Sequence, residues 1–119
     1  MTKPDAGPGP ATVICTYRVR AGAEKEFVAL LERHWPCLKR LDLVTDEPSR
    51  IYQGVDETKS PYFVEIFTWK NGEAPQRAHE LPEVMAVWEP MGELSEARGG
   101  RPPMEFPHVK PLRMSFGKA

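Results

Sequence analysis

Two histidines lie where an imidazole could take part in chemistry, one within a predicted helix and one just before another. His34 falls on the apolar stripe of the first predicted helix, one turn from both Leu31 and Leu38. In that position its ring could act as a general base or donate a hydrogen bond to a substrate. It could also be a hydrogen-bonded residue of the core, and the position leaves both roles open.

His79 lies in the connection that leads into a second predicted helix, three residues before Pro82. Its ring could reach a ligand at the mouth of that helix, bond the free N–H groups of the helix terminus, or face solvent. Cys37 follows His34 by one helical turn, as in a nucleophile–base pair, but the sequence offers it no orienting third group and no oxyanion site. The catalytic candidates are therefore His34 and His79.

Four larger side chains could form the walls of a pocket between sheet and helices. Trp69 ends a predicted strand, Tyr17 lies on the first strand, and Trp88 and Met91 share the apolar face of the second helix. Such aromatic residues either stack on a substrate or simply pack a small core. We predict that these four residues bind substrate.

A proline interrupts each predicted helix. Pro36 should conflict with the carbonyl of Glu32, and Pro90 with the carbonyl of Ala86, so both helices should kink. Kinked helices over a sheet tend to leave a gap, although each proline could instead end one helix and begin another. Either arrangement places the gap near His34 and the second helix.

Known metal and cofactor motifs are missing from the sequence. The three histidines, with Glu65 or Glu83, lack the short spacings of metal-binding motifs. We find no phosphate-cradling glycine motif, no dinucleotide fingerprint and no serine elbow. The sequence predicts neither a cofactor nor a metal.

The elements that must position these residues follow from hydrophobic periodicity. Residues 11–20, "ATVICTYRVR", alternate with a period of two and predict a strand, whereas apolar residues recur at helical spacing from Phe27 onward. The predicted elements are a strand at 11–20, a helix at about 23–41, a hairpin of strands at 50–55 and 62–70, a helix from Pro82, and a short strand at 104–109. This order is β-α-β-β-α-β, a ferredoxin-like α+β fold with a four-stranded antiparallel sheet and two helices on one face.

The two faces of that sheet lead to a prediction about assembly. We expect the helices to cover one face, with the other left open and a cross-strand pair of Arg18 and Glu65 upon it. The covered face is predicted to hold Val13, Cys15, Tyr17, Val64 and Ile66, and the open face Ile14, Phe63, Phe67 and Trp69. A contiguous apolar patch usually marks an interface, so we predict a homodimer through the open face; the alternative is that the C-terminal tail covers it.

Composition narrows the class of protein. The chain has 119 residues, of which 40% are hydrophobic and 28% charged, and its formal net charge is -1. One domain is expected at residues 11–110, between a Pro- and Gly-rich lead-in at 1–10 and a tail at 111–119. With both charge signs interspersed, we predict no binding to nucleic acid or membrane. Two cysteines and a start that lacks the apolar core of a secretory signal indicate a cytoplasmic protein.

The element order and three segments, "RVRAGAEKEFVALL", "FVEIFTW" and "AHELPEVMAVWEPM", resemble the antibiotic-biosynthesis monooxygenase-like family of the dimeric α+β barrel superfamily. The resemblance covers about residues 11–110. It implies a dimer and a cofactor-independent monooxygenase that acts on an aromatic or polyketide-like small molecule. Trp69 and His79 match the Trp and His of related haem-degrading enzymes, but the Asn of their first strand is absent here. A non-enzymatic dimeric module that binds a small molecule or responds to stress is the alternative.

Overall fold

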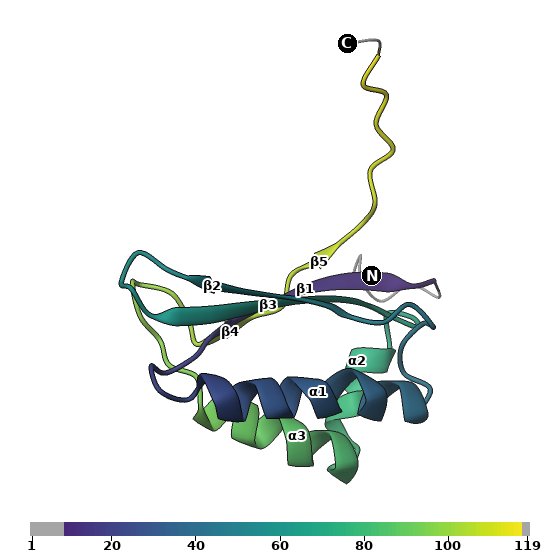
Figure 1. Ribbon diagram of the computed structural model, residues 1–119. Coiled ribbons are helices and arrows are strands. Elements are labelled where there is room, and N and C mark those ends of the chain that lie inside the picture. The colour runs from purple at the N-terminus through teal and green to yellow at the C-terminus, as the bar shows by residue number, and fades with distance from the viewer. Residues whose placement is uncertain (1–8, 118–119) are drawn as a thin grey trace.

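The central strand of the molecule is β1 (Ala11–Arg18), in a computed structural model that describes residues 9–117. The predicted lead-in at 1–10 lies almost wholly outside the described residues. The sheet is antiparallel and runs in the order β2-β3-β1-β4, with β5 also paired to β1. The other elements are α1 (Glu24–Arg40), β2 (Arg50–Val55), β3 (Pro61–Trp69), α2 (Ala74–His79), α3 (Pro82–Glu93), β4 (Met104–Glu105) and β5 (His108–Val109). All three helices lie on one face of this sheet (Figure 1).

Helix α1 is amphipathic, and its buried stripe includes Phe27, Leu31, His34 and Leu38. Acidic residues occupy its first turn and basic residues its last, which complements the helix dipole. Because His34 occurs at the helical spacing of the stripe, the same periodicity that buries the leucines carries the imidazole into the interior. The predicted helix at 23–41 is confirmed to within one residue at each end.

The predicted α+β fold is confirmed, with two differences in its second half. A short extra helix, α2, precedes α3, so the order is β-α-β-β-α-α-β. The single strand predicted at 104–109 is two short strands on either side of Pro107, which has no N–H to donate to a ladder. The carbonyl of Pro107 still accepts a hydrogen bond from the Ile14 N–H, which keeps this segment beside β1.

The predicted faces of β3 were wrong. Directly opposite residues of an antiparallel pair share a face, and Phe67 pairs with Val13 while Phe63 pairs with Tyr17. Phe63, Phe67 and Trp69 are therefore buried beneath the helices. The predicted Arg18–Glu65 pair is wrong as well, because Glu65 also points toward the helices and is fully buried.

The open face of the sheet carries a different apolar set from the predicted one. Ile14 pairs with Ile66 across the centre of the sheet, and Val64 pairs with Tyr52 nearer the β2 edge. Ile14, Val64 and Ile66 are partly exposed, and Tyr52 is exposed. Beyond β5 the described chain has no regular secondary structure and extends away from the sheet (Figure 1), with Leu112 and Phe116 exposed.

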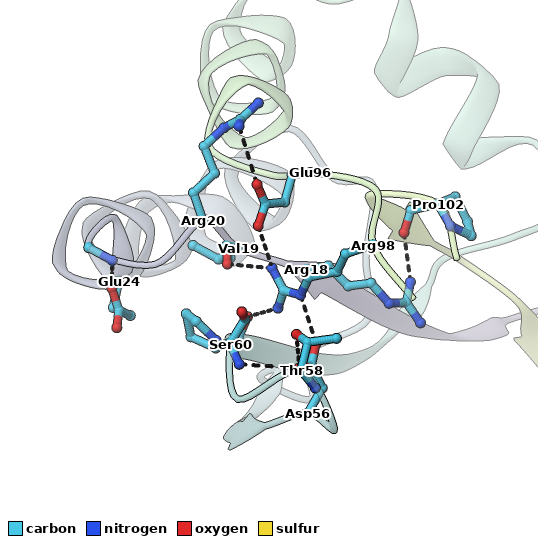
Figure 2. Close-up of polar contacts among 12 residues, drawn as sticks. Arg18, Val19, Arg20, Glu24, Asp56, Thr58, Ser60, Glu96, Arg98 and Pro102 are labelled. Atoms are coloured by element: carbon cyan, nitrogen blue, oxygen red, sulfur yellow. Dashed lines mark hydrogen bonds and ion pairs between the residues drawn. The ribbon is translucent and has the colours of Figure 1, made fainter. Parts of the chain in front are cut away.

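An arginine clamp closes the end of the sheet where β2 turns into β3. Arg98 donates to the carboxylates of Asp56 and Glu96 and to the backbone carbonyls of Val19 and Pro61. Figure 2 shows its guanidinium between Val19, Asp56 and Glu96. The clamp fixes the β2–β3 turn to the end of β1. Among the described residues, no helix is long and apolar enough to cross a membrane.

Candidate active site

A pocket of about 340 Å³ lies between the covered face of the sheet and helices α2 and α3. All six residues predicted for the site contribute to its wall: Tyr17, His34, Trp69, His79, Trp88 and Met91. They come from five different elements, so the fold brings together residues that are scattered in the sequence. The pocket lies at the place predicted from Pro36 and Pro90, both of which lie inside their helices.

His34 is the polar centre of the pocket wall and is only 3% exposed. Its Nδ1 lies 2.9 Å from Oε1 of Glu65, and its Nε2 lies 2.8 Å from Nε1 of Trp88. An indole nitrogen can only donate, so Nε2 of His34 must be the acceptor and therefore carries no proton. The single ring proton of the neutral imidazole is then on Nδ1 and is donated to Glu65. These contacts assign one tautomer, a neutral ring with its basic nitrogen on Nε2.

Glu65 holds His34 from the side away from Trp88. Its Oε1 accepts a second hydrogen bond, from the Tyr17 hydroxyl at 2.7 Å, and the residue has 0% exposure. Its Oε2 is buried with no hydrogen-bond partner among the described residues. A buried carboxylate of this kind is costly, so the fold retains it at a substantial energetic expense. Trp88, His34, Glu65 and Tyr17 thus form one continuous hydrogen-bonded chain beside the pocket.

Burial and the Glu65 carboxylate also determine the state of the two β1 side chains in the pocket wall. Burial, reinforced by the nearby Glu65, raises the pKa of the Tyr17 phenol well above its ordinary value. The same two causes, in the same order, raise the pKa of the Cys15 thiol. Tyr17 therefore remains a hydrogen-bond donor to Glu65 at neutral pH, and Cys15 remains a neutral thiol.

His79 occupies the outer part of the pocket and is exposed. Its ring packs edge-on against Trp88, with a centroid separation of 4.8 Å, while the rings of Trp88 and His34 are 6.2 Å apart. Trp88 therefore contacts both histidines, one in the interior and one at the rim. The two imidazoles share a pocket but have very different exposure.

The rest of the wall is mainly aromatic and sulfur-containing. Trp69 packs edge-on against Trp88 at 6.4 Å, and Phe67 packs edge-on against His34 at 5.7 Å. Further wall residues are Met85, Met104, Phe106 and His108. Flat faces and polarizable thioethers suit an aromatic ligand, and few polar groups compete for it.

Sequence reasoning missed Glu65 as a member of this site. The signal was present, because Glu65 is the one charged residue inside the apolar strand "YFVEIFTW". It also missed Met104, Phe106 and His108, which reach the pocket only because the chain returns along β1. The Cys37 thiol approaches Arg40 and the carbonyl of Glu83. In the part of the chain that the structure describes, no group of three or more His, Cys, Asp or Glu residues could hold a metal ion.

Comparison with known proteins gives structural matches only. No protein-family model matches the sequence, and no curated protein matches it significantly. A variant of SnoaB, a cofactor-independent oxygenase from Streptomyces nogalater, matches with a TM-score of 0.62 at 18% identity, over 92% of this chain and 98% of that one. Rv0793 from Mycobacterium tuberculosis matches with a TM-score of 0.64 at 17% identity, over 90% and 99% of the two chains.

A structure described as an antibiotic biosynthesis monooxygenase matches with a TM-score of 0.65 at 12% identity, over 87% of this chain and 99% of that one. The fold is that of the antibiotic biosynthesis monooxygenases. The sequence resemblance to that family is thus reproduced in three dimensions. At these identities the matches establish the α+β fold alone, and the chemistry has to be argued from the pocket itself.

Proposed function

We propose that this protein is a cofactor-independent monooxygenase acting on an aromatic or polyketide-like small molecule. The observation that supports this most directly is the His34 tautomer: a neutral imidazole with an unprotonated Nε2, in the wall of an aromatic-lined pocket. A base of that kind can remove a proton from a bound aromatic substrate. The likeness to SnoaB, which is described as a cofactor-independent oxygenase, supports the same reaction class.

The proposed reaction begins at an activated CH2 group of the substrate. Its proton moves to Nε2 of His34, and the electron pair remains on the carbon. That carbanion reduces O2 and forms the new C–O bond, giving a peroxide that takes back the proton. Loss of water, with the second C–H proton, leaves a carbonyl, so that CH2 and O2 become C=O and H2O. The protein contributes the base, the orientation and the exclusion of water.

The two predicted catalytic histidines then have different roles. His34 is the base, because it is buried and fixed in a tautomer by two hydrogen bonds. His79 is the exposed partner at the rim, where it contacts the entering or leaving molecule. Substrate stacks on Trp69 and Trp88, beside Tyr17 and Met91.

Oxygen uptake tests this proposal against the alternative of a non-enzymatic binding module. We expect the native chain to consume O2 with an activated substrate such as a hydroxylated anthrone, at a rate above that of the buffer. His34→Gln should lower that rate at least tenfold while the helical content stays unchanged. Binding of the anthrone without any oxygen uptake above background would instead favour the binding module.

We also propose that the protein is a homodimer built through the open face of the sheet, formed by Ile14, Val64 and Ile66. Their partial exposure on the uncovered face supports an interface there. Ile66→Glu should halve the mass measured by light scattering at micromolar concentration. Ile51→Glu is the matched control, because Ile51 is on the neighbouring strand but opposite Glu65 on the other face. An unchanged mass for Ile66→Glu would contradict this interface.

Two free buried thiols, Cys15 and Cys37, agree with a reducing compartment, and we propose the cytoplasm as the location.

A further inference from the structure

The basic nitrogen of His34 is covered. Nε2 is the only acceptor on a neutral Nδ1–H imidazole, and in this structure the Trp88 indole N–H occupies it at 2.8 Å. No proton can reach Nε2 from a bound molecule while that hydrogen bond is intact. If Nε2 were protonated, two N–H donors would face each other across this short distance, and the hydrogen bond would be lost.

We propose that Trp88 is a movable cap on the base, whose indole must leave Nε2 of His34 before His34 can accept a proton. The role of the cap rests on the proposed function, because covering Nε2 matters for catalysis only if His34 removes a proton from a substrate. The cap itself is a statement about two side chains and can be tested without any turnover.

The surroundings of Trp88 allow it to move, whereas those of His34 do not. Trp88 is only partly buried, and its neighbour at the rim, His79, is exposed and lies on a helix of six residues. The hydrogen bond to His34 is the polar contact that holds the indole in place. His34, in contrast, is 3% exposed and remains tied to Glu65 through Nδ1 when the cap opens.

This arrangement has two chemical consequences. While the cap is closed, the lone pair of Nε2 is engaged by the indole N–H and is not available to a substrate. When the cap opens, the freed indole N–H becomes a donor beside the pocket, and the anionic substrate that forms after proton removal can accept it. Glu65 is then the positioning residue that keeps the imidazole in the correct tautomer throughout, and it faces the ion that forms when Nε2 is protonated.

Several other ionisable groups could influence the protonation of His34, so the test has to be independent of pH. Glu65 on β3 bonds to His34, and the other ionisable residues line the same pocket: Cys15 and Tyr17 on β1, His79 on α2, Glu89 on α3 and His108 on β5. We therefore choose readouts at one fixed pH that report directly on Nε2.

The first experiment measures how readily Nε2 reacts. Diethyl pyrocarbonate acylates an unprotonated imidazole nitrogen, and peptide mass mapping separates His34 from His79. Added N-acetylhistidine serves as the standard, because the ring of His79 packs against Trp88 and its own rate can change with that residue. Trp88→Phe keeps a ring but removes the N–H, and it should raise the rate at His34 at least tenfold relative to the standard.

Trp69→Phe is the matched control, because it removes an indole from the same pocket without removing a bond to His34. We expect it to leave the His34 rate within about twofold of the native rate. Equal His34 rates in the native chain and in Trp88→Phe would overturn the cap.

A second measurement uses the native chain alone and does not depend on how a variant folds. In uniformly 15N-labelled protein, the Trp88–His34 hydrogen bond should give a scalar coupling between the indole Nε1 and the imidazole Nε2. Absence of this coupling, together with a proton found on Nε2, would overturn the proposal.

Addition of 2-naphthol as an aromatic probe tests the movement. Shifts of the Met85, Met91 and Met104 methyl signals report binding in the pocket, and the coupling should then disappear. Methyl shifts with an unchanged coupling would overturn the movement of the cap. A failure of 2-naphthol to shift the methyl signals would count against an aromatic-binding pocket, and thus against the proposed function, while the acylation rates still decide the cap.

Discussion

The molecule contains two polar networks that are built in opposite ways, one partly buried around Arg98 and one largely buried around His34. In the Arg98 clamp, one guanidinium meets two carboxylates and two backbone carbonyls, and the pocket beside it is lined mainly by polar and charged residues. In the chain around His34, every hydrogen bond joins two side chains, and one oxygen of Glu65 has no partner among the described residues. An aromatic pocket lies alongside.

The difference separates a group that holds the fold from groups that can take part in chemistry. Arg98 donates to backbone carbonyls that cannot move independently of the fold. Its hydrogen bonds therefore contribute to the stability of the folded state. The donors and acceptors around His34 are all side chains, which can exchange partners when a ligand enters. An incompletely satisfied polar chain beside a pocket lowers the stability of the fold, and proteins retain such groups mainly at functional sites.

The largest expected effect is on the clamp. Arg98→Met removes every guanidinium donor at once, so Asp56 and the two backbone carbonyls lose their hydrogen bonds from Arg98. We expect a loss of about 3 kcal/mol in the free energy of unfolding. Arg20→Met is the control, because Arg20 is exposed and its ion pair with Glu96 is 3.4 Å long. That variant should change stability by less than about 1 kcal/mol in urea unfolding. Equal losses for the two variants would contradict the distinction drawn for Arg98.

The second effect is on the chain around His34, and it should appear in activity more than in stability. In Glu65→Leu no acceptor remains for the Nδ1 proton of His34, so the ring loses the partner that fixes its tautomer and keeps Nε2 unprotonated. We expect oxygen uptake to fall at least tenfold, which corresponds to about 1.4 kcal/mol of barrier. The 15N spectrum of His34 should report the changed tautomer. Glu105→Gln, which alters a partly exposed pair with Arg18, should leave both readouts unchanged.

A smaller effect is expected for Tyr17→Phe. The change removes one of the two donors to Oε1 of Glu65 and should cost about 1 kcal/mol of stability. Nδ1 of His34 still donates to Glu65, so the tautomer should be the same as in the native chain. Tyr52→Phe removes a hydroxyl from the exposed face and should be close to neutral. A shifted tautomer in Tyr17→Phe would mean that Tyr17, and not Glu65 alone, orients the imidazole.

The smallest expected effect is the loss of stability that Asp56 causes at acidic pH. Hydrogen bonds from Thr58 and Arg98 hold the pKa of Asp56 well below its ordinary value. Its contribution to stability is therefore complete above the ordinary Asp pKa and is lost as the pH falls below about 4. Asp56→Asn lacks this contribution at every pH, so its urea midpoint should approach that of the native chain as the solution is acidified. A constant gap between the two midpoints from pH 6 to pH 3 would contradict this account.

Much of the fold could be predicted because local patterns determine it. The stripe that starts at Phe27 gave α1 to within a residue, and it also directed His34 inward. The faces of β3 could not be predicted in this way. Apolar residues occupy both sides of that strand, Phe63 and Phe67 on one and Val64 and Ile66 on the other, so a period of two cannot choose between them.

The charge of Glu65 made the error worse. A lone carboxylate is ordinarily expected on the solvent side of a strand, which favours the wrong face. Its burial depends on hydrogen bonds from Tyr17 and His34, which are 48 and 31 residues away in the sequence. Tyr17, His34, Trp88 and Met91 were found because their helical or strand spacing pointed inward. Trp69 and His79 were found mainly through the family resemblance. The hydrogen-bonded chain was not found, because only the packed fold shows which atoms meet.

The protonation state of the Cys15 thiol determines how easily peroxides formed in the proposed reaction would oxidise this residue. Oxidants such as peroxides attack the thiolate form of cysteine far more readily than the thiol. Burial and the negative charge of Glu65 raise the pKa of Cys15, so its sulfur stays protonated in the wall of the pocket. The carboxylate that orients His34 therefore also keeps the Cys15 sulfur in its less reactive form, and the proposed O2 chemistry would not consume this cysteine.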